Sequence, residues 1–183
     1  VPFPPESKMS GVERRFDYND TLKYQRSFTL PEEFTNDRVI LHFGAVDRYS
    51  KVFVNGSLVC ENDGGDLPFE ADITDALVEG ENIICVEVFD DLDTDYPYGK
   101  QSKARGGMWY TPISGIWQSV WLESVCDNYI RSLKITPETD AVTIEVDGGE
   151  EKKTLVLGDK TYEFLGDSIR IEIEQPKLWT PET

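Results

Sequence analysis

A stretch rich in glycine and tryptophan decides the fold, and residues 105–123 read Arg-Gly-Gly-Met-Trp-Tyr-Thr-Pro-Ile-Ser-Gly-Ile-Trp-Gln-Ser-Val-Trp-Leu-Glu. Its first half contains glycine, proline and serine at short intervals, which is typical of a loop. Its second half, from Ile116 to Glu123, alternates between two faces with the period of a β-strand. Because bulky side chains occur on both faces, the pattern predicts an inner strand covered on both sides, with Trp121 in the core.

The loop half carries two aromatic side chains, Trp109 and Tyr110, between a Gly-Gly pair and a Thr-Pro pair. Aromatic residues in such a setting occur either in the core or at the rim of a binding site. The pattern leaves both locations open. The loop that precedes them, from Tyr96 to Met108, is long, and long loops in compact β domains are usually functional or disordered.

Upstream of this stretch, alternating apolar positions predict short strands at residues 21–30, 38–44, 51–54, 58–61, 69–73 and 82–89. Asn55-Gly56 lies between two of them and is a strong signal for a tight hairpin. The proline-rich start, Val1 to Gly11, is expected to wrap the surface in extended form. Short strands at regular spacing with little helix indicate an all-β sandwich.

A boundary is predicted at Cys126-Asp127-Asn128. Beyond it, the pattern predicts five more strands, at residues 129–136, 142–146, 154–157, 162–165 and 168–173. Such a series suggests an immunoglobulin-like sandwich, although that fold usually needs about 100 residues. This second domain is therefore expected to be shortened.

The motifs, taken as a set, resemble the N-terminal region of glycoside hydrolase family 2, which includes β-galactosidases, β-glucuronidases and β-mannosidases. The resemblance covers residues 1 to about 125 and is carried by Gly106 to Leu122 and by Val1–Ser7, Phe43–Asp47, Val54–Gly56, Gly64–Thr74 and Tyr96–Gln101, in the order of the family. It implies a jelly-roll sugar-binding-type domain over residues 1–126 and a truncated immunoglobulin-like β-sandwich over residues 127–183. An uncovered sheet edge in the second domain predicts self-association through residues 129–174 or disorder there, so a homo-oligomer stays open.

The resemblance also implies a substrate rim, because two segments of this domain reach the active site in some family members. The corresponding residues form the candidate site: Glu6, Ser7, Tyr96, Arg105, Gly107, Trp109 and Tyr110. Some β-galactosidases have an acidic residue at the position of Gly107, so the departure here argues against galactose specificity. Sugars bind flat aromatic faces with hydrogen-bonding groups at the edge, and these loops supply both.

Charge and cysteine content limit the partners. The 18 basic and 35 acidic residues give a net charge of −17, which disfavours nucleic acid and anionic membranes as partners. Cys60, Cys85 and Cys126 are widely spaced and predict free thiols rather than a disulfide framework. No stretch is apolar for long enough to suggest a membrane span, and no signal peptide opens the sequence. We expect a cytoplasmic protein, and whether a leader once preceded Val1 stays open.

No catalytic, metal or cofactor site is predicted in the chain. His42 is the single histidine and lacks a second ligand at metal spacing, so we expect a structural role. Asp91, Asp93 and Asp95 have the opening spacing of a calcium loop, but Tyr96 and Ser102 replace its glycine and glutamate. A solvated loop is expected there. In the resembled family both catalytic glutamates lie on a (β/α)₈ barrel, and nothing here alternates strand and helix as a barrel must.

The leading hypothesis is a non-catalytic N-terminal fragment of a retaining glycosidase, which scaffolds and rims the active site of a missing barrel. Its partners would be that barrel domain and a carbohydrate bound by the full-length enzyme. An autonomous carbohydrate-binding module is the alternative, and a structural sandwich that binds nothing is a third. Binding of a soluble sugar by these residues alone would favour the module.

Overall fold

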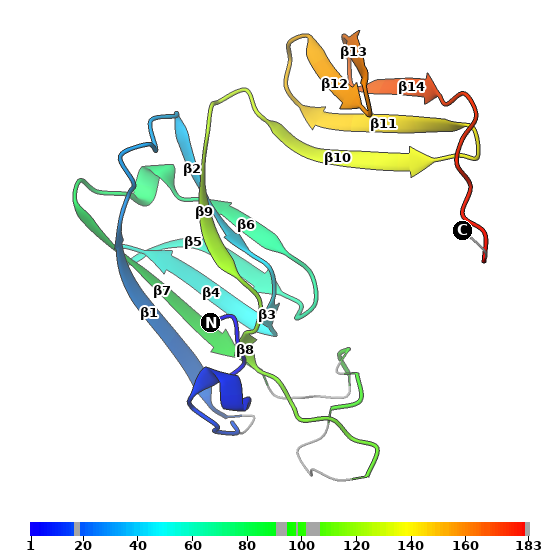
Figure 1. Ribbon diagram of the computed structural model, residues 1–183. Helices are drawn as coiled ribbons and strands as arrows, with labels where there is room; N and C mark the ends of the chain where they lie inside the picture. Colours follow the sequence, from blue (N-terminus) through cyan, green and yellow to red (C-terminus); the bar gives the residue numbers. More distant parts are fainter. Residues whose placement is uncertain (17–18, 91–94, 98, 102–106, 182–183) are drawn as a thin grey trace. The chain divides into compact units, whose positions relative to one another are not determined.

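The computed structural model describes residues 1–16, 19–90, 95–97, 99–101 and 107–181. The chain divides into two compact units: unit 1, Val1–Val125, and unit 2, Cys126–Thr183. Strands dominate both units, and the only helical elements among the described residues are two 3-10 turns, η1 (Lys8–Ser10) and η2 (Thr74–Ala76). The predicted all-β class is confirmed (Figure 1).

Unit 1 is a β-sandwich of two antiparallel sheets, as predicted. The first sheet has the order β1 (Thr21–Thr29), β7 (Glu81–Phe89), β4 (Tyr49–Val54), β5 (Ser57–Asp63). The second has the order β6 (Phe69–Asp72), β2 (Arg38–Phe43), β9 (Val120–Val125). The short strands β3 (Val46–Asp47) and β8 (Gly115–Ile116) form a separate antiparallel pair.

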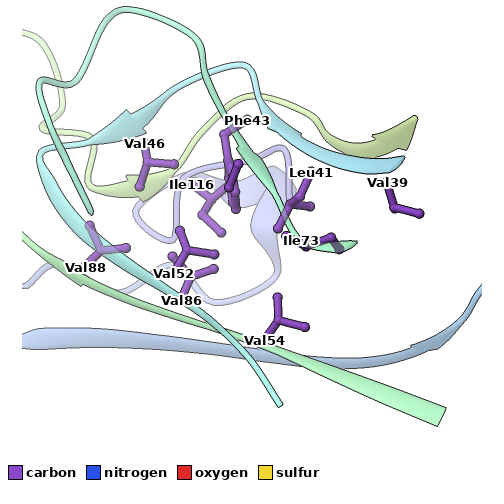
Figure 2. Packing of buried hydrophobic residues seen from close by; sticks show 11 residues of the cluster. Val39, Leu41, Phe43, Val46, Val52, Val54, Ile73, Val86, Val88 and Ile116 are labelled. Atoms are coloured by element: carbon purple, nitrogen blue, oxygen red, sulfur yellow. The ribbon is translucent and has the colours of Figure 1, made fainter. Parts of the chain in front are cut away.

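The core of unit 1 lies between the two sheets, where side chains from opposite sheets point toward one another (Figure 2). Phe43 and Leu41 from β2 and Val52 from β4 are each 0% exposed. Phe43 stacks on Phe69 with ring centroids 4.7 Å apart. Along β4 the buried positions follow a period of two, so the alternation in the sequence builds this part of the core.

The predicted hairpin at Asn55-Gly56 joins β4 to β5, and both residues have positive φ angles, 50° and 83°. The Asn55 side chain also ties the turn to β7: its Oδ1 accepts from the backbone N of Ile83 at 2.9 Å. Its Nδ2 donates to Asn82 Oδ1 at 2.7 Å. Asparagine is thus required here for both backbone shape and cross-strand bonding.

The prediction for the strand that ends the opening stretch is wrong in three respects. The segment splits into β8 and β9, and β9 is an edge strand rather than an inner one. Trp121 is 47% exposed, whereas Val86, Phe43 and Val52, for which we also expect burial in this core, are buried. Trp121 lies opposite His42 in the β2–β9 register and points away from the core, because Val120 and Leu122 take the core-facing positions.

Unit 2 contains the five predicted strands. β10 (Ile130–Pro137), β11 (Ala141–Gly148) and β14 (Ser168–Glu172) form one sheet, and β12 (Lys153–Leu157) and β13 (Lys160–Phe164) form a hairpin. Apolar side chains of the hairpin pack against a small core of Val142, Ile144, Val146 and Ile171. This arrangement is a small two-layer structure with a sheet on one side and a hairpin on the other.

The three cysteines are free, with Cys126 exposed and the other two half-buried. No helix among the described residues is long and apolar enough to cross a membrane. Asp91 and Asp93, which belong to the run with the spacing of a calcium loop, lie outside the described residues.

Candidate functional site

The candidate rim loop leaves the sandwich between β7 and β8, and its described residues project beyond β8 (Figure 1). Its return path, Pro112 to Ile116, is held by side chains rather than by a continuous strand ladder. Three backbone N–H groups donate to side chains of separate segments: Ile113 to Gln101 Oε1 at 2.6 Å, Ser114 to Glu6 Oε2 at 3.2 Å, and Ile116 to Tyr24 Oη at 3.3 Å. The base of the loop is therefore fixed from three directions.

Close packing adds to this anchoring. Gly115 has a φ of +75°, and a Cβ at this position would collide with the Tyr24 hydroxyl, so glycine is required on both counts. The indole Nε1 of Trp117 donates to the backbone oxygen of Gly65 at 2.9 Å. These contacts join the loop base to the segment between β5 and β6.

The predicted rim residues separate into anchoring and exposed groups. Glu6 is 8% exposed, and its carboxylate anchors the loop base by accepting the hydrogen bond from Ser114. Burial raises the pKa of this carboxyl group. Ser7 caps η1, because its Oγ accepts from the backbone N of Ser10 at 3.3 Å. Sequence reasoning places both on the rim, whereas their side chains bond within the N-terminal segment and to Ser114.

The exposed group is aromatic. Trp109 is 44% exposed, Tyr110 is 66% exposed and Tyr96 is 43% exposed. The Arg48 guanidinium lies 3.7 Å from the centre of the Tyr96 ring, a cation–π contact that orients the ring. Gly107 is exposed with a φ of +61°, which suits glycine, and Arg105 lies outside the described residues. Trp109 and Tyr110 therefore do not lie in the core of the sandwich.

A backbone bond fixes the stem of this aromatic loop. Tyr110 N donates to the backbone oxygen of Lys100 at 2.8 Å, and Gln101 pairs with Tyr110 in an isolated bridge. Gln101 therefore contacts both sides of the loop, since its side chain also receives the Ile113 bond. The aromatic side chains rest on a stem that is anchored rather than on a free loop.

Several carboxyl groups lie at the same end. Burial, with the nearby charges of Asp90 and Asp66, raises the pKa of Asp47 to about 7, and Arg48 partly offsets the rise. Gly65 packs against Asp47 so closely that a Cβ there would collide with the carboxylate. Asp47 therefore takes up a proton near neutral pH, which links the stability of this end to pH. Among the described residues, no group of three or more carboxylate, cysteine or histidine side chains could hold a metal ion.

A second aromatic surface lies on the outer face of the three-stranded sheet. The rings of Trp121 and His42 stack with centroids 4.9 Å apart and planes inclined by 9°. Both ring nitrogens of His42 contact carboxylates: Nδ1 lies 3.2 Å from Glu70 and Nε2 lies 2.9 Å from Glu123. His42 thus has the structural role expected of it, and Trp121 is held as a flat, half-exposed platform.

Comparison with known proteins assigns the chain to a family. The model of the glycosyl hydrolases family 2, sugar binding domain, matches residues 11–125. The chain belongs to this family. The matched range holds both sheets of unit 1 and the aromatic loop with its return path, whereas Glu6 and Ser7 of the candidate site precede it.

The relatives of this family 2 chain are much longer. A β-galactosidase of Thermoanaerobacter pseudethanolicus is 34% identical over 64% of this chain and 15% of its own length. A β-glucuronidase of Canis lupus familiaris is 36% identical over 99% of this chain and 33% of its own length. The solved β-glucuronidase of Faecalibacterium prausnitzii shares the fold, with a TM-score of 0.70 at 24% identity, over 99% of this chain and 36% of that one.

Several contacts that hold the aromatic loop of the family 2 domain leave no pattern in the sequence. Tyr24 and Gln101 were not identified as anchors, because each bonds a residue far away in sequence. The pairing of Arg48 with Tyr96 also joins distant segments. The one local signal was glycine at position 115, where a positive φ marks a close approach.

Proposed function

We propose that this chain is the non-catalytic N-terminal part of a longer retaining glycosidase that hydrolyses O-glycosyl bonds. Its first unit would scaffold a (β/α)₈ barrel, and its aromatic loop would rim the active site of that barrel. The observation that carries the proposal is an exposed aromatic pair, Trp109 and Tyr110, on a loop whose stem is fixed by Gln101. A sandwich does not need these side chains for its own core.

The chemistry of the rim supports a carbohydrate as the ligand. Flat indole and phenol faces pack against the C–H surface of a pyranose, while polar groups at their edges bond its hydroxyls. Because Glu6, Gln101 and Tyr24 fix the backbone of the loop base, less entropy would be lost in ordering the loop when the sugar binds. The family assignment and the short share of each relative that the chain covers support a catalytic domain outside these 183 residues.

The test is made in the full-length enzyme, with two tryptophans of similar exposure. Trp109→Ala is expected to lower kcat/KM about tenfold, which corresponds to about 1.4 kcal/mol of lost transition-state stabilisation, with little change in Tm. Trp121, which is 47% exposed on another face, provides the matched control, and Trp121→Ala should leave kcat/KM within about twofold. Unchanged kinetics for Trp109→Ala, or a large loss of Tm, would remove the rim assignment.

An autonomous carbohydrate-binding module is the second candidate, and the Trp121 platform favours it. One face of Trp121 is covered by His42, and the indole remains about half exposed beside the Glu123 carboxylate. If the 183-residue chain alone binds a neutral β-linked tetrasaccharide in calorimetry, and Trp121→Ala abolishes this binding, the module is supported. Absence of binding favours the rim function, and binding unaffected by Trp121→Ala would mean that Trp121 is not the platform of such a module.

A further inference from the structure

The turn between β4 and β5 carries a sequence that can lose ammonia spontaneously. Of the asparagines in the chain, only Asn55 is followed by glycine. Because glycine has no side chain to shield its backbone nitrogen, the nitrogen of Gly56 can attack Cγ of Asn55. The new C–N bond closes a succinimide ring while the Cγ–Nδ2 bond breaks, and Nδ2 leaves as ammonia with the proton of the Gly56 nitrogen. Water then opens the ring to aspartate or isoaspartate.

The fold holds both ends of the reacting amide. Asn55 Oδ1 accepts from the backbone N of Ile83 at 2.9 Å. Asn55 Nδ2 donates to the backbone oxygen of Ala76 at 2.8 Å and to Asn82 Oδ1 at 2.7 Å. The backbone N of Asn55 also donates to the oxygen of Ile83 at 2.9 Å. The amide is therefore fixed against residues 76–83, and Nδ2 can leave only after two hydrogen bonds break.

Asn82 makes the same contact intolerant of the product. Asn82 is 0% exposed, and its Nδ2 donates to the backbone oxygens of Val78 and Gly80. Its Oδ1 accepts from the backbone N of Val78 as well as from Asn55, so the Asn82 amide cannot turn over without losing these bonds. An aspartate in place of Asn55 would set an oxygen, instead of an NH₂ group, against two acceptors, Asn82 Oδ1 and the oxygen of Ala76. Acceptors that face one another without a proton between them repel.

The turn also lies where the sandwich can open locally. Among the described residues, β5 ends the four-stranded sheet and pairs with β4 alone. A hairpin at such an edge opens without unfolding the whole domain. We propose that Asn55 is a latent modification site: it deamidates when its contact with Asn82 opens, and the product then prevents the contact from closing. The residues involved lie in the β4–β5 turn and in residues 76–83, so the inference is independent of the proposed glycosidase function.

The first test follows deamidation of the 183-residue chain at mildly alkaline pH, in the folded state and in guanidinium chloride. Peptide mass spectrometry measures the modified fraction at Asn55. The folded chain should react at least about tenfold more slowly, because the reaction waits for a local opening. The retardation should match, within about threefold, the hydrogen-exchange protection of the Ile83 amide, which Asn55 Oδ1 holds. Equal rates in the two states, or a reaction in the folded chain faster than this protection allows, would overturn the proposal.

The second test uses Asn55→Asp, which reproduces the aspartate product. It should lower Tm by about 4–8 °C, as expected for two lost hydrogen bonds that leave a buried acceptor facing an oxygen. Asn36→Asp is the matched control: Asn36 is exposed, and its Nδ2 donates to the distant backbone oxygen of Ser124 at 3.0 Å. This change at the surface should alter Tm by about 2 °C or less. If Asn55→Asp is as stable as the parent chain, or loses no more than Asn36→Asp, the product can close the turn and the proposal fails.

Discussion

Units 1 and 2 are built from the same alternation of apolar and polar residues, yet they bury it to different depths. In unit 1, Leu41, Phe43 and Val52 are each 0% exposed, because two sheets close over them. In unit 2, the core residues Val142, Ile144, Val146 and Ile171 remain 4–8% exposed. Alternation determines which face of a strand is apolar, and a second layer determines whether that face is buried.

β10 shows the difference most clearly. Leu133 and Ile135 are paired with Val146 and Ile144 of β11, so they share the core-facing side of the sheet. They are nevertheless 54% and 60% exposed. The β12–β13 hairpin supplies Leu155, Tyr162 and Phe164 to the core of unit 2, and that core does not extend to β10. The apolar side of this strand is formed but not covered.

The largest expected effect is in the core of unit 1. Phe43→Ala should lower the free energy of unfolding by about 3–5 kcal/mol, because it removes a fully buried ring and leaves a cavity. The stacking of Phe43 on Phe69 would be lost as well. Urea denaturation measures the loss, and hydrogen exchange should localise it to residues 1–125.

Ile144→Ala in unit 2 is the comparison for this variant. Its loss should be smaller, about 2 kcal/mol, and localised to residues after 125, since the small core collapses more easily around a missing side chain. Equal losses in the two variants would show that exposure on this scale does not separate the two cores.

The second prediction concerns Asp47, whose pKa is about 7 in the folded chain. Because the unfolded value is near 3.9, the folded state keeps a proton that the unfolded state releases, so stability falls as pH rises between about 4 and 7. Asp47→Asn removes this dependence and should stabilise unit 1 by roughly 1–3 kcal/mol at about pH 8, with little effect at about pH 4.

Urea denaturation of Asp47→Asn and of the parent chain at both pH values gives the measurement. Glu79→Gln, at an exposed position, serves as the control and should change the free energy of unfolding by less than about 0.5 kcal/mol. A gain for Asp47→Asn that is as large at low pH as at high pH would assign the effect to packing against Gly65 rather than to charge.

Much of the fold was predictable because it is local. The period of two, the Asn55-Gly56 turn and the break near Cys126 all lie within a few residues of the structure they specify. The location of Trp121 was not predictable in this way, because bulky residues on both faces of a strand do not show whether a layer covers the outer face. The exposed face carries Trp121 on His42 and two glutamates instead.

The candidate site was predictable only in part, for a related reason. The exposed aromatic loop is visible in the sequence through its glycine and proline spacing. Its anchors are not, since Tyr24 and Glu6 reach Ile116 and Ser114 across about a hundred residues of chain. Hydrogen bonds of that range follow from the fold and leave no local pattern.

The third prediction compares two tryptophans of the opening stretch. Trp117 is half-buried and donates its indole N–H to Gly65, so Trp117→Ala should lower the free energy of unfolding by about 2 kcal/mol. Trp121→Ala should cost about 1 kcal/mol, because it loses mainly the contact with His42. Urea denaturation of the two variants gives the ranking, and a loss above about 3 kcal/mol for Trp121→Ala would restore it to the core.

The smallest expected effect on stability is at the uncovered side of unit 2. Ile135→Thr replaces a side chain that is 60% exposed and retains a β-branched residue, so the free energy of unfolding should change by less than about 0.5 kcal/mol. Its effect on association should be larger, because exposed apolar side chains on an edge strand favour pairing with a second copy. Sedimentation over a range of concentrations should show the parent chain associating and the variant remaining monomeric. Val156→Thr, at an exposed position of the β12–β13 hairpin, is the control and should associate like the parent. If the parent chain stays monomeric at every concentration, the exposed apolar side of β10 does not cause association. The two units would then differ in the burial of their apolar side chains but not in their tendency to assemble.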